Sequence, residues 1–372
     1  MARLRIGVIF GGRSGEHEVS LVSATSVINA LDPERYEVIP IGITPEGRWL
    51  SSGRALALLK AKEGSAGEPE RFLAPEPNRH SLIAVAEGED PVPLDVIFPV
   101  MHGTYGEDGT VQGLLELADL PYVGAGVLGS AVGMDKIAQK QILQQEGFPV
   151  AKYLSLLASE YAASPAAVAG RIERTFRYPL FVKPANTGSS VGITKAHNRK
   201  ELRAALDLAA TYDRRLIVEQ GIRGAREIEC AVLGNDAPEA SVLGEIVPSN
   251  EFYDYEAKYV DGKSEAVIPA RLPRAVATSI RAMAVRAFRA IDCAGMARVD
   301  FFVTRRSNRV VLNELNTIPG FTSISMYPKL WEASGLSYPA LLDRLIELAL
   351  ERHKAKRHLR HAYQPAREWY RQ

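Results

Sequence analysis

The segment 296–316 constrains the fold and the chemistry of this chain more than any other. It reads as two β-strands in which polar groups alternate with apolar residues. Side chains two apart on a strand share a face, so Arg298 lies beside Asp300, and Glu314 lies beside Asn316. If the strands pair through the polar turn between them, Asp300 faces Glu314. Two carboxylates so placed repel each other unless a cation lies between them.

The oxygen-rich set of Asp300, Glu314 and the Asn316 amide therefore predicts a magnesium site. Mg²⁺ takes one or two carboxylates and completes its shell with water and substrate phosphates. The alternative is a solvated strand face that carries ordinary surface charges.

Composition bounds the class of protein. With 372 residues the chain has room for two or three domains, and a hydrophobic fraction of 46% is ample for buried cores. A net charge of +1 gives no reason to expect nucleic acid or a membrane as a partner. The basic run at 352–371 is the local exception, and such a terminus is usually solvated.

The two cysteines, Cys230 and Cys293, lie in apolar segments and cannot form a disulfide framework. We expect both to be buried in a reducing compartment. The N-terminal apolar run is too short for a signal peptide, and no segment has the roughly 18 apolar residues that span a bilayer. These patterns predict a soluble, cytoplasmic protein.

The first part of the chain has the pattern of an open, mainly parallel α/β sheet up to about residue 130. The polar stretch 51–91 within it reads as an irregular excursion. The elements expected here are a strand at Arg5–Phe10, a helix at Val19–Ala30, and strands at Tyr36–Ile43 and Leu94–Val100.

A new unit begins with the helix expected at Met134–Glu146, where Asp135 can complement the helix N-terminus. The stretch 249–264 is polar and aromatic and too irregular for a core element. The other elements expected are strands at Leu180–Lys183, Leu216–Glu219 and Glu227–Leu233, and helices at Arg199–Ala210, Ala275–Ile291 and Tyr338–His353.

The first glycine-rich turn, 11–20, lacks the G-x-G-x-x-G spacing of a dinucleotide-binding turn. Glu16 stands where the next helix begins and would repel a pyrophosphate. An acid there is favoured by the helix dipole and could equally hold the ammonium group of an amino acid. A plain helix-start glutamate is the structural alternative.

The segment 181–192 predicts a nucleotide phosphate site. Lys183 projects from the end of a strand, and the Gly/Ser loop 188–192 can turn backbone N–H groups toward an anion. The segment is not a Walker A loop, because it lacks Gly-Lys-Ser/Thr. Lys136 can supply a second cation. A Gly/Ser loop alone would be only a loop, but the lysine and the downstream oxygen ligands favour a nucleotide.

Three further segments have a pattern typical of a ligand site. The aromatic and charged tract 252–259 resembles a lid. After the second polar strand, Pro and Gly expose the Gly320 N–H, which can donate to an oxyanion. His102 follows a strand at its carboxyl end, where α/β folds place ligands, although a lone histidine is more often structural.

Together these motifs resemble the D-alanine–D-alanine ligases of the ATP-grasp superfamily, over nearly the whole chain from residue 5 to about 341. The resemblance implies an α/β (α+β overall) ATP-grasp fold with an N-terminal Rossmann-like domain. Its expected units are 1–130, 131–222 and 223–372. The blocks that carry it are Gly11–Ser20, Met101–Thr110, Met134–Lys136, Lys183–Gly192, Phe252–Tyr259 and Arg298–Ser325.

The resemblance also implies roles for the nucleotide-binding residues. Lys136 and Lys183 would contact ATP phosphates beneath the loop that contains Ser190. Phe181 and Phe302 would wall the adenine, Glu219 would lie near its edge, and Glu227 would accept from the ribose. The chain is one residue longer than the family pattern between Glu219 and Glu227. Two Mg²⁺ ions, with Mn²⁺ as a possible substitute, would be held by Asp300, Glu314 and Asn316.

The implied reaction phosphorylates one D-alanine and then joins a second, for peptidoglycan precursor synthesis. Arg298 with the Gly320 N–H would stabilise the tetrahedral oxyanion. Glu16 would hold the first ammonium group, helped by His102. Ser325 and Lys258 would lie near the carboxylate of the second D-alanine. Glu16, Ser189 and Tyr259 would form a hydrogen-bonded set that holds the lid shut.

Several alternatives stay open at this point. A D-alanine–D-lactate ligase, or another ATP-grasp carboxylate–amine ligase, would use the same chemistry, but the intact Lys258-Tyr259 pair favours a peptide product. The poor glycine register disfavours a nicotinamide-dependent dehydrogenase. An amino-acid-binding protein would leave the oxygen cluster without a purpose. We expect a homodimer that binds only small molecules.

Overall fold

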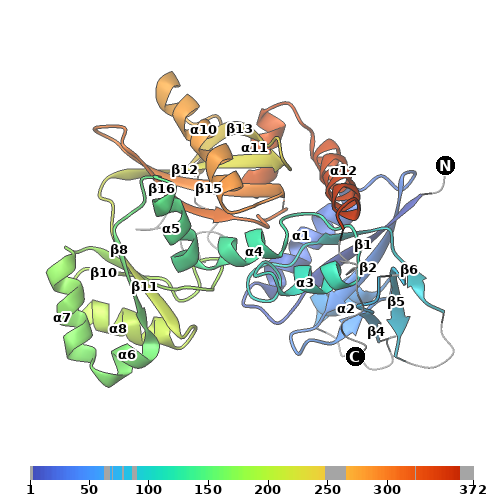
Figure 1. Ribbon diagram of the computed structural model, residues 1–372, viewed down its shortest axis with the longest axis horizontal. Coiled ribbons are helices and arrows are strands. Elements are labelled where there is room, and N and C mark those ends of the chain that lie inside the picture. Colours follow the sequence, from blue (N-terminus) through green and yellow to red (C-terminus); the bar gives the residue numbers. More distant parts are fainter. Residues whose placement is uncertain are drawn as a thin grey trace, which may run out of the picture.

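The computed structural model describes residues 3–62, 68, 70–77, 79–85, 90–247, 265–322 and 324–360. Four sheets organise this part of the chain (Figure 1). No helix among these residues is both long and apolar enough to cross a bilayer.

The N-terminal sheet has the strand order β3-β2-β1-β7, and β1 runs parallel to both of its neighbours. The apolar run of β1 is fully buried at Ile6, Val8 and Phe10, as expected for a strand covered on both faces. The helix α1 packs against β1. The bounds are β1 Leu4–Gly11, α1 His17–Ala30, β2 Tyr36–Ile43, β3 Trp49–Leu50 and β7 Val96–Pro99.

The prediction of an irregular excursion at 51–91 was wrong. The described part of this stretch holds one helix and most of a three-stranded antiparallel sheet of order β4-β5-β6. Its strands have two to four residues, which is too short for an alternating pattern to stand out. The bounds are α2 Ala55–Ala61, β4 Arg71–Leu73, β5 Ser81–Ala84 and β6 Val92–Pro93.

The second sheet is antiparallel, with the order β10-β9-β11-β8 (Figure 1). Its apolar core joins Val182 and Val218 of the sheet to Ile172 and Leu206 of the covering helices. Its elements are β8 Tyr153–Leu157, α6 Ala158–Ala163, α7 Pro165–Thr175, β9 Leu180–Pro184, β10 Thr194–Ala196, α8 Arg199–Ala210 and β11 Arg215–Gln220.

Three helices precede this sheet and connect it to the N-terminal sheet. The expected helix at Met134–Glu146 is shorter, because Met134 ends α4 and a new helix starts after Asp135. The Asp135 carboxylate accepts from the N–H groups of Ile137 and Ala138 at 3.0 and 2.8 Å, as an N-cap does. The bounds are α3 Thr110–Leu117, α4 Val127–Met134 and α5 Lys136–Gln145.

The third sheet is antiparallel, with the order β14-β13-β12-β15-β16. Alternate residues of β12 and β15, such as Cys230 and Val299, pack on α10 in one core. The opposite face of the same strands carries Glu229, Arg298 and Asp300. The bounds are β12 Ala225–Gly234, β13 Glu239–Val247, β14 Glu265–Val267, α10 Arg274–Ala290, β15 Gly295–Thr304 and β16 Val310–Asn316.

The last two helices of the described residues are α11 (Met326–Ala333) and α12 (Tyr338–Arg357). Leu341 and Leu345 of α12 share a core with Phe10 of the N-terminal sheet and Met296 of β15. Helix α12 therefore packs against both the N-terminal sheet and the third sheet (Figure 1). Both cysteines are free and buried, which confirms the part of the expectation that concerns their burial.

Candidate active site

Two adjoining cavities lie where the three main sheets meet. We call them the small cavity, of ≈ 130 Å³, and the large cavity, of ≈ 420 Å³. Ligand pockets usually enclose roughly 300–1,000 Å³, so the large cavity has the size of one. The residues that line both cavities are Ser190, Ile193, Glu229, Arg298 and Glu314.

The predicted strand register is confirmed: Asp300 of β15 pairs with Glu314 of β16, and Arg298 pairs with Asn316. On the other side of β15, Asp300 pairs with Glu229 of β12. Three carboxylates thus form one row across three neighbouring strands. This row forms because side chains alternate between the two faces of each strand, and these three carboxylates lie on the face opposite α10.

The guanidinium of Arg298 lies among these carboxylates. Its Nε and Nη2 donate to the two oxygens of Asp300 at 2.8 and 2.7 Å, and its Nε lies 3.2 Å from Oε2 of Glu229. Burial alone would lower the pKa of Arg298, but the charges of Asp300 and Glu229 raise it well above its usual value. The site therefore keeps one permanent cation within the acidic row.

The donor set of the row fits magnesium chemically. Asp300 and Glu314 supply carboxylate oxygens on neighbouring strands, and Asn316 supplies an amide oxygen that accepts from the Ile318 N–H at 3.0 Å. Across residues 3–360, apart from the undescribed gaps, no three His, Cys, Asp or Glu side chains are gathered as a metal cluster. Both Asp300 oxygens are instead engaged by Arg298.

Lys183 and Glu219 line the large cavity, and two further buried lysines, Lys136 and Lys140, lie close to it. Glu219 of β11 lies 2.9 Å from Lys183 of β9 and 3.1 Å from Lys140 of α5. Burial alone would raise the pKa of Glu219, but the two ammonium groups lower it to about 2. Lys136, at the first position of α5, donates to the carbonyl of Thr187 at 2.5 Å. Burial lowers the pKa of Lys136.

The Gly/Ser loop after β9 lies closed against the first glycine-rich turn. Ser189, Ser190 and Gly192 have positive φ angles of 43°, 61° and 72°, which turn the backbone sharply. The Ser189 hydroxyl donates to Glu16. A Cβ at Gly188 would lie 2.0 Å from Oε2 of Glu16, so only glycine permits this approach.

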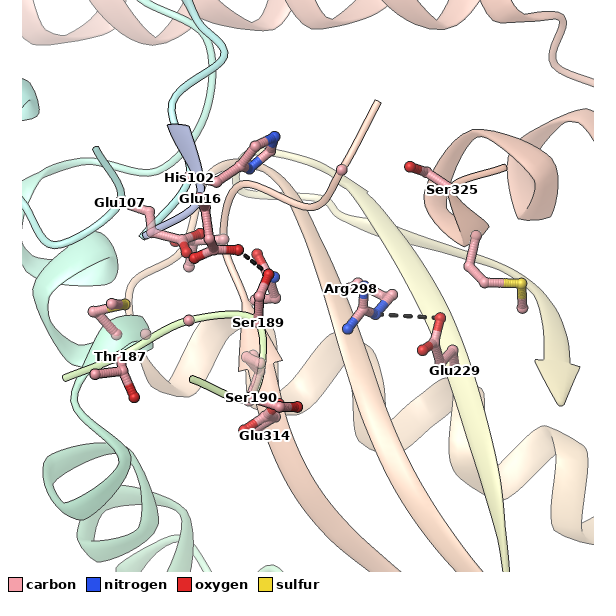
Figure 2. A pocket seen from close by; sticks show the side chains of 18 of the residues that line it. Glu16, His102, Glu107, Thr187, Ser189, Ser190, Glu229, Arg298, Glu314 and Ser325 are labelled. Atoms are coloured by element: carbon pink, nitrogen blue, oxygen red, sulfur yellow. Dashed lines mark hydrogen bonds and ion pairs between the residues drawn. The ribbon is translucent and has the colours of Figure 1, made fainter. Parts of the chain in front are cut away.

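Glu16 is buried at the N-terminus of α1, yet its side chain does not cap the helix. One carboxylate oxygen accepts from Ser189, and the other has no hydrogen-bond partner among the described residues. Glu107, which accepts from the Gly103 N–H at 2.9 Å, lines the same cavity (Figure 2). Burial, followed by the nearby charge of Glu16, raises the pKa of Glu107.

His102 lines the small cavity, but both its ring nitrogens have structural partners. Nδ1 lies 3.1 Å from the carbonyl of Ile318, and Nε2 lies 3.1 Å from the hydroxyl of Ser23. Burial lowers the pKa of His102. Through His102, the segment after β7 therefore contacts both α1 and the segment after β16.

Gly320 and Ser325 also line the small cavity. Ser325 Oγ accepts from the Thr322 N–H at 3.0 Å and lies 2.8 Å from its hydroxyl. A Cβ at Gly320 would come within 2.8 Å of Ser325 Oγ, so the absent side chain lets this loop fold back on itself.

Phe181, Glu227 and Phe302 all line the large cavity. Glu227 of β12 pairs with Phe302 of β15 in the sheet, and the Lys195 ammonium lies 5.8 Å from the Phe181 ring centroid. All but one of the predicted nucleotide-binding residues line the large cavity; the exception, Lys136, lines the small cavity. Lys258 and Tyr259 lie outside the described residues.

Three buried charged residues of the site were not predicted. Lys140 lies one helical turn after Lys136, so the i, i+4 spacing would have placed both on one face. Glu229 follows Glu227 by two residues on β12 and shares its face. Glu107 lies in a turn, where no periodicity indicates which way its side chain points.

Comparison with known proteins agrees with this geometry. The family model described as D-ala D-ala ligase N-terminus matches residues 5–125, and D-ala D-ala ligase C-terminus matches residues 142–347. The structure of the D-alanine-D-alanine ligase from Coxiella burnetii has a TM-score of 0.83 and 41% identity, covering 96% of this chain and 97% of that one. The fold is accordingly of the ATP-grasp class.

Curated relatives are similar along almost their whole length. A D-alanine--D-alanine ligase of Natranaerobius thermophilus is 52% identical over 96% of this chain and 97% of its own. The D-Ala:D-Ser ligase VanG of Enterococcus faecalis is a structural neighbour with 38% identity and a TM-score of 0.82, covering 94% of this chain and all of that one. This chain belongs to the D-alanine–D-alanine ligase family.

Proposed function

We propose that this protein joins two D-alanine molecules into D-alanyl-D-alanine at the expense of ATP, for the synthesis of peptidoglycan precursors. The observation that carries the proposal is the pair of cavities that share Arg298 as a wall. One cavity is large enough for a nucleotide, and the other is small and lined by carboxylates, a histidine and an arginine. A carboxylate activated at the junction is then within reach of an amine.

In the first step the γ-phosphoryl group of ATP passes to the carboxylate of one D-alanine, giving an acyl phosphate and ADP. Such transfers depend mainly on positioning and charge neutralisation. Lys136 and Lys183 are suited to hold phosphates beneath the Ser190 loop. Phe181 and Phe302 would enclose the adenine, with Glu219 and Glu227 near its edge and the ribose.

In the second step the amine of another D-alanine attacks the acyl phosphate, and phosphate leaves. Arg298 and the Gly320 N–H are suited to stabilise the oxyanion. Glu16 would hold the first ammonium group, because its buried second oxygen lacks a partner among the described residues. His102 would orient this wall, and Ser325 and Lys258 would lie near the second carboxylate. Closure of the Ser189–Glu16 contact, joined by Tyr259, would exclude water.

Asp300, Glu314 and Asn316 would hold two Mg²⁺ ions, for which Mn²⁺ could substitute. The ions would supply charge neutralisation for the phosphates. The two carboxylates face each other across β15 and β16, and their oxygens are the hard ligands that such ions select.

The acceptor is the least constrained part of the proposal, because the D-Ala:D-Ser ligase VanG has a similar fold. Phosphate release measured in parallel with D-alanine, L-alanine, D-serine and D-lactate tests it. We expect D-alanine to give the highest kcat/KM and a dipeptide by mass spectrometry. Faster turnover with D-lactate at neutral pH would identify an ester-forming ligase, and failure with every D-amino acid would refute the proposed function.

We also propose a cytoplasmic homodimer with units at 1–130, 131–222 and 223–372. Leu117 at the end of α3, and Val127 and Leu128 at the start of α4, expose 63, 42 and 59% of their surface. These exposed apolar side chains lie on two helices that contact each other, and we propose that they meet a second copy. Light scattering on the purified protein should give twice the mass of the chain.

A further inference from the structure

Glu229 has no part in the roles assigned above, yet it is central to the site. It is one of the five residues that line both cavities, and it is only 6% exposed. A buried carboxylate of this kind is costly unless it serves a charged partner. Oε2 of Glu229 lies 3.2 Å from the Nε of Arg298 (Figure 2).

The strand order gives Glu229 a particular place. β15 lies between β12 and β16, so Glu229 and Glu314 flank Asp300 from opposite sides. Arg298 is on β15 itself and is paired with Ala231, which has no functional group, on the β12 side. From the β12 side, Glu229 forms an ion pair with Arg298.

Two partners compete for the carboxylate oxygens of Asp300, namely Arg298 and a divalent cation. In this structure both its oxygens accept from Arg298, at 2.8 and 2.7 Å. The proposed function also assigns Asp300 to a divalent cation. A bound cation would draw electron density from the Asp300 carboxylate and so weaken its hydrogen bonds to the Arg298 guanidinium. Arg298 then needs a second anionic partner to stay at the junction of the cavities.

We propose that Glu229 is a positioning residue for Arg298. It holds the guanidinium at the junction of the two cavities when Asp300 is shared with a divalent cation. This inference rests on the proposed function for the meaning of Arg298, but its contacts are independent of the substrate. Glu229 acts through Arg298 and is not itself a metal ligand.

The test compares Glu229→Gln with Asp300→Asn. Residues that orient a group bound at a metal site typically contribute about 10–100-fold. We expect Glu229→Gln to lower kcat by about 10–100-fold, with the KM for ATP changed less than about threefold. Mn²⁺ affinity in the presence of ADP, measured by electron paramagnetic resonance, should stay within about threefold for Glu229→Gln and fall more than about tenfold for Asp300→Asn.

A matched control removes a carboxylate that pairs with arginine far from the site. Asp95 accepts from Arg5 at 2.9 and 2.6 Å in the N-terminal sheet, so Asp95→Asn should leave kcat and Mn²⁺ affinity within about twofold of the wild type. If Glu229→Gln weakens Mn²⁺ as much as Asp300→Asn does, Glu229 is a metal ligand and the inference is wrong. A kcat equal to that of Asp95→Asn also overturns it.

A second readout does not depend on activity. In ¹⁵N-arginine-labelled protein with Mg²⁺ and ADP, the Arg298 Nε–H signal, identified by its loss in Arg298→Lys, should be protected from exchange. We expect this protection to be lost in Glu229→Gln, which keeps the size of the side chain but removes its charge. Unchanged protection in Glu229→Gln contradicts the inference. A wild type that makes no dipeptide refutes the proposed function alone, because the Mn²⁺ and exchange measurements still decide the role of Glu229.

Discussion

Arg298 shows how one residue can serve two neighbouring cavities. Its planar guanidinium binds both oxygens of Asp300 and still directs Nε toward Glu229. A lysine has a single point charge and could not make this arrangement. Because carboxylates on two strands fix the cation, Arg298 would need little reorganisation to stabilise the oxyanion of the proposed second step.

We expect Arg298→Ala to lower dipeptide formation by about 10²–10³-fold or more, because one preorganised oxyanion donor is lost. ATP binding, measured by calorimetry, should remain. The control is Arg344→Ala, whose guanidinium pairs with Glu347 and Glu351 on the same helix. Loss of ATP binding in Arg298→Ala, with the chemical step unchanged in single-turnover experiments, would instead assign the arginine to the nucleotide.

Glu219 makes a prediction about stability and pH. Its pKa in the folded protein is about 2 and its ordinary value is 4.5. The lowered pKa means that its stabilising contribution is complete above about pH 5 and is lost as the pH falls toward 2. We expect Glu219→Gln to be less stable by about 3–5 kcal/mol at pH 7, because Lys140 and Lys183 lose their buried partner.

The difference in free energy of unfolding between wild type and Glu219→Gln should therefore narrow by about 1.4 kcal/mol per pH unit below pH 4.5. Urea unfolding at several pH values measures it. The exposed Glu239→Gln serves as a control and should stay parallel to the wild type. A constant difference from pH 6 to 3 would show that Glu219 does not titrate with folding in this way.

Much of the site could be predicted from sequence because its residues lie on strands. The two-residue period placed Arg298 with Asp300, and the predicted pairing of Asp300 with Glu314 is what the structure has. Glu107 and Lys140 could not be assigned in the same way. The i, i+4 spacing places Lys140 on the face of Lys136, but it does not show that Lys140 meets Glu219. The proximity of Glu107 to Glu16 likewise arises from packing between distant elements.

At the scale of elements, long and strongly patterned segments were predicted best. The bounds expected for the strand Tyr36–Ile43 and the helix Arg199–Ala210 are those observed. β8, β13 and α11 were not predicted. Tyr153–Leu157 shows why, because its burial does not alternate: it is half exposed, with only Leu156 buried. Tertiary contacts decide such segments more than local propensity does.

The loop after β9 depends on a glycine. We expect Gly188→Ala to lower kcat and to expose the loop to limited proteolysis, because the new Cβ would lie 2.0 Å from Glu16 Oε2 and 3.3 Å from Glu107 Oε1. Gly113→Ala is the matched control, since a Cβ there meets nothing within 4 Å. Wild-type turnover in Gly188→Ala would mean that this close approach is not needed for the reaction.

At the scale of the whole molecule, α12 holds the N-terminal sheet against the third sheet. Arg352 near its end donates to the carbonyls of Gly124 and, at 3.1 Å, Tyr122, and its guanidinium lies 4.3 Å from the Tyr122 ring centroid. Asp343 of the same helix accepts from Arg35 and Tyr36. These contacts hold α12 against the N-terminal part of the chain.

We expect Arg352→Ala to lower the free energy of unfolding by about 2–3 kcal/mol, because it removes charged hydrogen bonds and a cation–π contact between elements. Arg344→Ala on the same helix removes only exposed intrahelical pairs and should cost less than about 0.5 kcal/mol. Denaturant unfolding compares the two. Equal losses would show that the contact of Arg352 with the N-terminal unit contributes nothing particular to stability.

The shared wall between the two cavities also matters for inhibitor chemistry. A compound that fills only one cavity competes with abundant cellular nucleotide or with free amino acid. Tethering a purine-like head to a small zwitterion through the Arg298 junction would make the second contact intramolecular, so that its effective concentration depends on the tether. Such a tether has to pass the five residues that line both cavities.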